Sequence, residues 1–394
     1  MNHHAIVPIE RLTLPVALDG TQGTNRAMSH QPKIAAGNDL EAIMAWYGRF
    51  RDKKNTFESY RREGERLLLW SIKALGKPLS SLSHEDFQHY EEFLKSPTPE
   101  DVWIAKTKHH RDNPEWRPFF GPLTTSSIRH TMGVINNLMS WLVEAQYLAG
   151  NPLTLQRKKR GKKNPTRLTR FLYTDQWEAV LRYVETMPRE SDREIEHYER
   201  SRWISRLFYL AGMRISEVAE NSMGCFQRFR DSKGIYRWNL VITGKGDKER
   251  AIPVGEDLLE ALTRYRKSVG LTAFPTAGEA TPLVVSLRNK EMREGIKRQA
   301  LDKSIKSIFE GTADMLELSE DEHERNSGMI LRYASAHWIR HSAGSHMANA
   351  GVQLTRVRDF LGHDNIQTTS IYLHTENEEF HDEVSRLHRL PGQQ

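Results

Sequence analysis

Cysteine is almost absent from this sequence, which has one, Cys225, in 394 residues. A lone cysteine excludes an intramolecular disulfide framework and any multi-cysteine zinc site. Long apolar runs are missing as well, because no stretch approaches the roughly 20 apolar residues that a membrane-spanning helix needs. Near the N-terminus, Glu10, Arg11 and two prolines interrupt the apolar stretch that could have formed a secretory signal. The sequence therefore predicts a soluble, reduced, cytoplasmic protein with no membrane partner.

Signatures of metal and nucleotide binding are also lacking. His337, His341 and His346 invite a zinc interpretation, but they form no HExxH pair and no cysteine cluster supports them. The sequence has neither a P-loop nor a dinucleotide fingerprint. We therefore expect no metal site, no cofactor and no nucleotide-driven step.

The distribution of charge says more than its sum. The chain holds 57 Lys and Arg against 51 Asp and Glu, a formal charge of +6, but residues 156–170 hold eight cations and no acid. Gly161 and Pro165 within this run indicate a linker rather than a helix face. Such a run is usually just solvated, yet a basic linker between two domains is well placed to cross a phosphate backbone. The candidate DNA-binding residues are Arg157, Lys158, Lys159, Arg160, Lys162 and Lys163.

The chain before this linker has the pattern of a small helical domain. Residues 1–36 show no sustained periodicity and are expected to be a flexible tail. Residues 37–153 contain periodic apolar positions that predict helices beginning near Asp39, Phe57, Ser83 and Thr125. Between the last two helices, the proline-rich residues 96–124 are interpreted as a long surface insertion.

After the linker, assigned to residues 154–170, a second domain of residues 171–394 is expected. Helices are predicted from Thr174, from Ser201 to Ala211 and from Ser216, with Arg214 in the turn between the last two. Two β-type runs, residues 238–243 and 250–254, flank a glycine-containing loop and predict a hairpin. Residues 310–324 hold seven acids and no Lys or Arg, which indicates a solvated loop or helix edge.

Several polar residues of this second domain could carry chemistry, although each has an ordinary interpretation. Arg214 could form a salt bridge with Glu217, and Lys245 in the hairpin loop could serve solubility alone. His337 and Arg340 are three residues apart and share a helix face, as a surface pair would.

Two candidates lie closer to the C-terminus. His363 follows Leu361 and Gly362 past a helix end, where capping is the default role. Tyr372 lies in a segment where a tyrosine is normally part of the core. None of these residues is decisive alone.

Their order and spacing resemble the tyrosine recombinase, or phage integrase, family of site-specific DNA recombinases. The matching segments are Ala-Gly-Met-Arg-Ile-Ser-Glu-Val, Gly-Lys-Gly-Asp-Lys-Glu-Arg-x-Ile-Pro-Val, His-x-x-Arg-His, and Leu-Gly-His with a tyrosine nine residues later. The resemblance covers about residues 171–375, and the helical first domain resembles the family's core-binding domain only in kind.

The resemblance implies a mainly helical fold with a small β-sheet, in which a core-binding domain and a mixed α/β catalytic domain form a two-domain DNA clamp. It implies a metal- and ATP-independent strand transferase that works through a 3′-phosphotyrosyl intermediate, with Glu217 in a supporting role and a C-terminal segment exchanged between subunits. The catalytic residues that it implies are Arg214, Lys245, His337, Arg340, His363 and Tyr372. The long N-terminal tail, the 96–124 insertion and the acidic stretch depart from the usual pattern without removing a motif residue.

The partners that follow are double-stranded DNA with a specific recombination site and a homotetramer on synapsed sites, with accessory DNA-bending proteins as a further possibility. The expected setting is a nucleoid-associated cytoplasmic enzyme acting on a mobile element or a replicon. Two alternatives stay open: a DNA-relaxing enzyme like the type IB topoisomerases, and a non-catalytic sequence-specific DNA-binding protein. Strand exchange between two duplexes separates the first alternative from recombination, and indifference to loss of Tyr372 marks the second.

Overall fold

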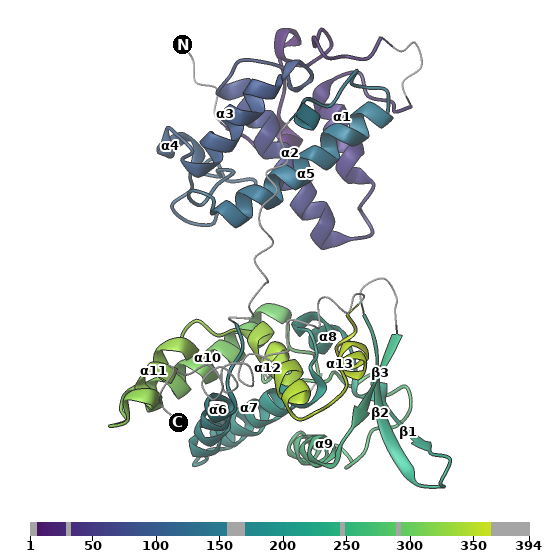
Figure 1. The fold of residues 1–394 in the computed structure, drawn as a ribbon, viewed down its shortest axis with the longest axis vertical. Coiled ribbons are helices and arrows are strands. Elements are labelled where there is room, and N and C mark those ends of the chain that lie inside the picture. Colours follow the sequence, from purple (N-terminus) through teal and green to yellow (C-terminus); the bar gives the residue numbers. More distant parts are fainter. Residues whose placement is uncertain (1–5, 29–32, 156–169, 245–248, 289–292, 364–394) are drawn as a thin grey trace, which may run out of the picture. The chain divides into compact units, whose positions relative to one another are not determined.

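The chain forms two compact units in a computed structural model, residues Met1–Gly161 and Lys162–Gln394 (Figure 1). The structure describes residues 6–28, 33–155, 170–244, 249–288 and 293–363. No helix in these ranges is both long and apolar enough to cross a membrane. Nor do these residues contain a group of three or more His, Cys, Asp or Glu side chains suited to holding a metal ion.

The first unit is helical. Its helices are α1 (Asp39–Gly48), α2 (Lys54–Lys73), α3 (His84–Lys95), α4 (Glu100–Trp103) and α5 (Thr125–Glu144). Polar N-caps explain where several of them begin: Asn38 accepts from the Glu41 amide, and Ser83 and Asp86 form a reciprocal capping box. The helices predicted from the periodicity are thereby confirmed.

Two expectations about this unit are wrong. Residues 6–28 and 33–36 of the segment expected to be a flexible tail pack against the helices, with Ile9 only 1% exposed and its amide donating to the Glu65 carboxylate at 2.7 Å. The proline-rich segment is not a mere surface insertion either, because Trp103 and Phe119 are buried and joined through their backbones. Both segments contain only short turns of helix, such as α4, so their sequences show no sustained period, yet scattered large apolar side chains still fill the core.

The second unit combines helices with one small sheet. Its helices are α6 (Thr174–Thr186), α7 (Asp192–Ala211), α8 (Ile215–Glu220), α9 (Glu256–Ser268), α10 (Arg298–Glu317), α11 (Glu322–Leu331), α12 (Ala336–Asn349) and α13 (Leu354–Leu361). The helix expected from Ser201 begins nine residues earlier because Ser191 and Glu194 form a capping box. The acidic stretch forms the end of α10 and the start of α11.

The sheet is antiparallel, in the order β1 (Phe226–Arg230), β2 (Tyr236–Thr243) and β3 (Glu249–Val254). Leu240 of β2 pairs with Phe226 on one side and Ile252 on the other, and all three side chains are buried. The predicted hairpin is therefore confirmed, whereas β1 was not predicted because four of its five residues are exposed and show no alternation. Figure 1 shows the sheet at one side of this unit, with α13 beside β3. The mainly helical fold with a small sheet is confirmed.

Candidate active site

The turn that carries Arg214 is fixed by a glycine. Helix α7 ends at Gly212, whose left-handed backbone (φ 54°) lets the chain reverse into α8. A Cβ at this position would lie 2.8 Å from Leu361 Cδ2, so the end of α13 packs directly on the glycine. Arg214 follows as the N-cap of α8, with its side chain half-exposed. The sequence around Gly212 thus brings Arg214 to the end of α13.

Glu217 holds Arg214 from the first turn of α8. Its carboxylate accepts from both the Arg214 amide and the Arg214 Nη1 atom, each at 2.8 Å. The same carboxylate also accepts two parallel bonds from Arg250 of β3, at 2.8 Å each. Burial by itself raises the pKa of Glu217, but hydrogen bonds and charges from Arg250 and Arg214 outweigh it and lower that pKa to about 2. One buried carboxylate therefore orients two guanidinium groups.

Arg340 joins three helices at the same place. It lies on α12 and is 2% exposed, and its guanidinium donates to the backbone carbonyls of Gly212 and Leu361. These carbonyls belong to the C-terminal ends of α7 and α13, where unpaired carbonyls attract a cation. The arginine is thus fixed by segments 128 and 21 residues away in the sequence.

His363 reaches this cluster because α13 also ends in a left-handed glycine. Gly362 (φ 62°) accepts from Arg214 Nη2 at 3.2 Å, and a Cβ there would lie 2.8 Å from Arg250 Cδ. The amide of His363 donates to the Arg358 carbonyl, which closes the helix. The same left-handed turn therefore ends α13 and brings the Leu-Gly-His segment to the arginines.

The histidines of the site stand in a field of positive charge. Burial and the charges of Arg340, Arg214 and Arg250 lower the pKa of His363 to about 4. Burial and the charges of Arg340, Arg214 and Arg170 lower the pKa of His337 in the same direction. His337 Nε2 lies 2.7 Å from His341 Nε2, and burial with the neighbouring His337 and Arg340 lowers the pKa of His341 to about 3. These imidazoles are neutral at neutral pH.

The structure brings together five of the residues singled out from the sequence, namely Arg214, Glu217, His337, Arg340 and His363. The other expected site residues lie outside the residues that the structure describes; they are Lys245, Tyr372, Arg157, Lys158, Lys159, Arg160, Lys162 and Lys163. Arg250 also belongs to the cluster; it stands in the hairpin segment, but no role is predicted for it from the sequence because only the fold aims it at Glu217. His341 was considered only as a metal ligand.

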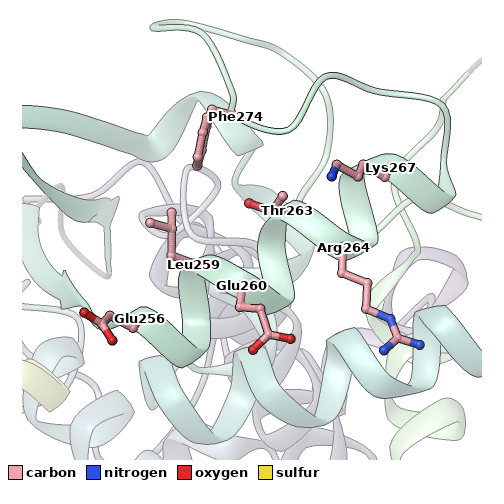
Figure 2. A pocket seen from close by; sticks show the side chains of 7 residues that line it. All are labelled: Glu256, Leu259, Glu260, Thr263, Arg264, Lys267 and Phe274. Atoms are coloured by element: carbon pink, nitrogen blue, oxygen red, sulfur yellow. The ribbon is translucent and has the colours of Figure 1, made fainter.

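A hollow of about 490 Å³ lies elsewhere on this unit, along α9 (Figure 2). Leu259 and Phe274 form its apolar part, and Glu256, Glu260, Thr263, Arg264 and Lys267 line the rest. It contains no residue of the arginine and histidine cluster. The hollow therefore lies outside the candidate active site.

The Glu217 ion pairs predict an acid-sensitive fold. Because the pKa of Glu217 is lowered to about 2 from the model-compound value of 4.5, its stabilisation is complete above about pH 4.5 and is lost as the pH falls towards about 2. The shift corresponds to about 3 kcal/mol. We expect Glu217→Gln to be destabilised at neutral pH and to lose less stability on acidification than wild type, in urea unfolding followed by circular dichroism. Glu256→Gln, at an exposed position of α9, is the control, and equal acid sensitivity of all three proteins would contradict the prediction.

Comparison with known proteins identifies the family of this chain. Residues 170–379 match the model of a family described as the phage integrase family. The chain belongs to this family. Among curated relatives, a tyrosine recombinase of Thermosipho africanus is 23% identical over 86% of this chain and 94% of its own length. Tyrosine recombinase XerC of Xanthomonas campestris is 26% identical over 81% of this chain and 78% of its own length.

Solved structures share the fold. A post-cleavage complex of the XerH site-specific recombinase with palindromic difH substrate has a TM-score of 0.57 at 16% identity, over 97% of this chain and 99% of that chain. The Tn1549 transposon integrase in complex with a circular intermediate DNA has a TM-score of 0.54 at 16% identity, over 88% of this chain and 99% of that chain. As a tyrosine recombinase, the protein is a DNA-binding enzyme of DNA recombination, a DNA strand transferase.

Proposed function

We propose that this recombinase cleaves and rejoins DNA at specific sites through a 3′-phosphotyrosyl intermediate, in the integration, excision or resolution of a mobile element or replicon. The observation that carries the proposal is the convergence of Arg214, Arg340 and His363 on the ends of α7 and α13. A guanidinium pair beside a neutral imidazole is suited to one phosphodiester. The XerH recombinase with difH substrate and the Tn1549 transposon integrase with a circular intermediate DNA share this fold, which supports DNA as the substrate.

The charge of the cluster favours a phosphate. Two guanidinium groups, those of Arg214 and Arg250, pair with Glu217, and the charges of Arg340, Arg214 and Arg250 all act on His363. Guanidinium groups offer an anion the fork geometry that fits non-bridging phosphate oxygens. In this scheme Arg214 and Arg340 hold the two non-bridging oxygens, and His363 donates a hydrogen bond to the phosphate. The same contacts strengthen as charge accumulates in the transition state.

The bond changes follow from a tyrosine nucleophile. The Tyr372 oxygen attacks phosphorus and forms a 3′-phosphotyrosyl bond, while the bond from phosphorus to the 5′ oxygen breaks. The phenolic proton passes to His337, which is neutral and can accept it, and Lys245 protonates the departing 5′ oxygen. A 5′ hydroxyl from another strand then reverses these steps. The phosphoester is retained throughout, so resealing needs neither ATP nor a metal ion in this scheme.

Both units and the segment between them are proposed to contact duplex DNA, with four copies of the chain acting on two paired sites. Accessory DNA-bending proteins and a nucleoid setting belong to the same proposal. The DNA contacts of the linker are assigned to Arg157, Lys158, Lys159, Arg160, Lys162 and Lys163.

Neutralising the linker lysines tests this assignment. We expect a variant with Lys158, Lys159, Lys162 and Lys163 changed to glutamine to bind duplex DNA more weakly and with a shallower salt dependence. Each lost phosphate contact reduces the slope of log affinity against log salt by about 0.9. Fluorescence anisotropy across a salt series measures the slope, with Lys297→Gln, Lys303→Gln, Lys306→Gln and Lys233→Gln combined as a charge-matched control. An unchanged slope would remove the linker from the DNA contact surface.

The central experiment captures the covalent intermediate. The protein is expressed in bacterial cells and denatured, and DNA that remains attached after stringent washing is sequenced. Enrichment at discrete loci supports the proposed function and delivers the target site, whereas DNA scattered without preference favours a relaxing enzyme like the type IB topoisomerases. If no adduct forms even with DNA from the native source, the catalytic proposal is refuted and a sequence-specific DNA-binding protein remains.

A further inference from the structure

Leu172, just before α6, is held by two side chains of the catalytic helix α12. Its amide donates to Ser342 Oγ at 2.8 Å, and its carbonyl accepts from His346 Nε2 at 2.9 Å. Leu172 itself is completely buried. Ser342 and His346 are four residues apart and share one face of α12. Both backbone groups of one residue are therefore fixed by the helix that also carries His337 and Arg340, an arrangement we call the Leu172 clamp.

Both side chains of the Leu172 clamp are themselves locked. Ser342 Oγ donates to the Trp338 carbonyl at 2.8 Å while it accepts from Leu172. His346 donates through Nε2, so its Nδ1 accepts from the Tyr209 hydroxyl at 2.8 Å. Burial lowers the pKa of His346 and keeps the ring in this neutral form. The position of Leu172 relative to α12 is thus determined at both ends of the clamp.

The Leu172 clamp places Arg170 near the active site. Arg170 is two residues before Leu172, within about 7 Å of chain, and His337 precedes Ser342 by about 7.5 Å along the α12 axis. Arg170 is exposed, and within the described ranges no carboxylate pairs with it. Its positive charge also acts on His337, together with those of Arg340 and Arg214. The entry of the chain into the second unit therefore brings an exposed cation close enough to α12 for its charge to act on His337.

We propose that Arg170 is a further DNA-binding residue of the active site, which contacts a phosphate neighbouring the scissile one and is held beside His337 by the Leu172 clamp. The proposal rests on the strand-transfer function, because the bound DNA supplies the anion. Arg170 contacts substrate in this assignment, whereas Ser342 and His346 are positioning residues that act through it. A charge at this position also helps to keep His337 neutral and able to accept a proton.

The first test needs no DNA. Titration of His337 is followed by NMR in wild type, Arg170→Gln and Arg170→Lys, with the signal assigned from a His337→Gln variant. The other groups that face His337, namely Arg340, Arg214 and His341, are unchanged in these proteins. We expect His337 to titrate at higher pH in Arg170→Gln and as wild type in Arg170→Lys. The matched control is Arg182→Gln, an exposed arginine of α6 that pairs with Glu324. Equal titration in Arg170→Gln and wild type would overturn the placement of Arg170.

The second test measures duplex DNA binding across a salt series in a Tyr372→Phe background, so that cleavage cannot interfere. We expect Arg170→Gln to reduce the slope of log affinity against log salt by about 0.9, while Arg170→Lys and Arg182→Gln leave it unchanged. An undiminished slope in Arg170→Gln would refute the phosphate contact.

The Leu172 clamp is tested by a double-mutant cycle. His346→Leu should reproduce part of the slope change and of the His337 shift, and it should add nothing once Arg170 is glutamine. Full additivity would show that the clamp does not act through Arg170 and would refute its positioning role. None of these measurements requires strand cleavage. An absent covalent adduct would therefore refute the proposed function, while the tests of Arg170 and of the clamp would still give their own outcome.

Discussion

Replacing Tyr372 by phenylalanine is expected to abolish covalent DNA capture while leaving DNA affinity unchanged. The substitution removes one oxygen, the proposed nucleophile, and keeps the ring. Ionising a free tyrosine at neutral pH costs about 4 kcal/mol. The reaction therefore depends on the proton acceptor and the cations around the phosphate rather than on an ionised phenol. Since the cluster of Arg214, Arg340 and His363 would still bind the phosphate, binding and chemistry should separate in this variant.

The measurement pairs covalent capture with anisotropy of an intact duplex. Tyr333→Phe is the matched control, because Tyr333 is 81% exposed in the turn before α12 and lies outside the cluster. We expect it to form adduct as wild type does. An adduct that persists in Tyr372→Phe would show that another residue is the nucleophile. Loss of DNA affinity together with the adduct would assign Tyr372 a role in binding or folding instead.

Removal of the Arg340 guanidinium is the second large effect that we expect. Arg340→Ala should lower the rate of adduct formation by about 10²–10³, the usual loss for one donor to a transition-state oxyanion. It should also destabilise the second unit, because the Gly212 and Leu361 carbonyls lose a buried donor. These carbonyls anchor α7 and α13, so displacement of Arg214 and His363 adds to the loss.

Arg340→Lys separates the two contributions. A lysine keeps the charge but cannot donate to two carbonyls and a phosphate in fork geometry, so we expect partial recovery of stability with little recovery of rate. Single-turnover cleavage of a recovered target duplex and thermal unfolding give the two readouts. Arg332→Ala is the control, since Arg332 pairs with Asp314 and Glu317 at the surface. A rate in Arg340→Ala within the range of that control would remove Arg340 from the chemistry.

Several features of the protein follow from short-range sequence patterns alone. Apolar periodicity and caps such as Ser83 with Asp86 predicted the helices, and two β-type runs around a glycine loop predicted the β2–β3 hairpin. The order of Arg214, His337, Arg340 and His363 was enough to suggest the family, to which residues 170–379 belong. The roles of Lys245 and Tyr372 stay predictions of that motif order.

Which residues meet in space depends on long-range packing that no local pattern encodes. Ile9 and Phe119 lie in segments whose sequence shows no sustained period, and they are buried because distant helices offer apolar surface. Arg250 pairs with Glu217 across 33 residues, and Leu172 is clamped by side chains 170 and 174 residues away. Local propensity acts over a few residues, whereas such contacts form only when the whole core packs and buried polar groups must find partners.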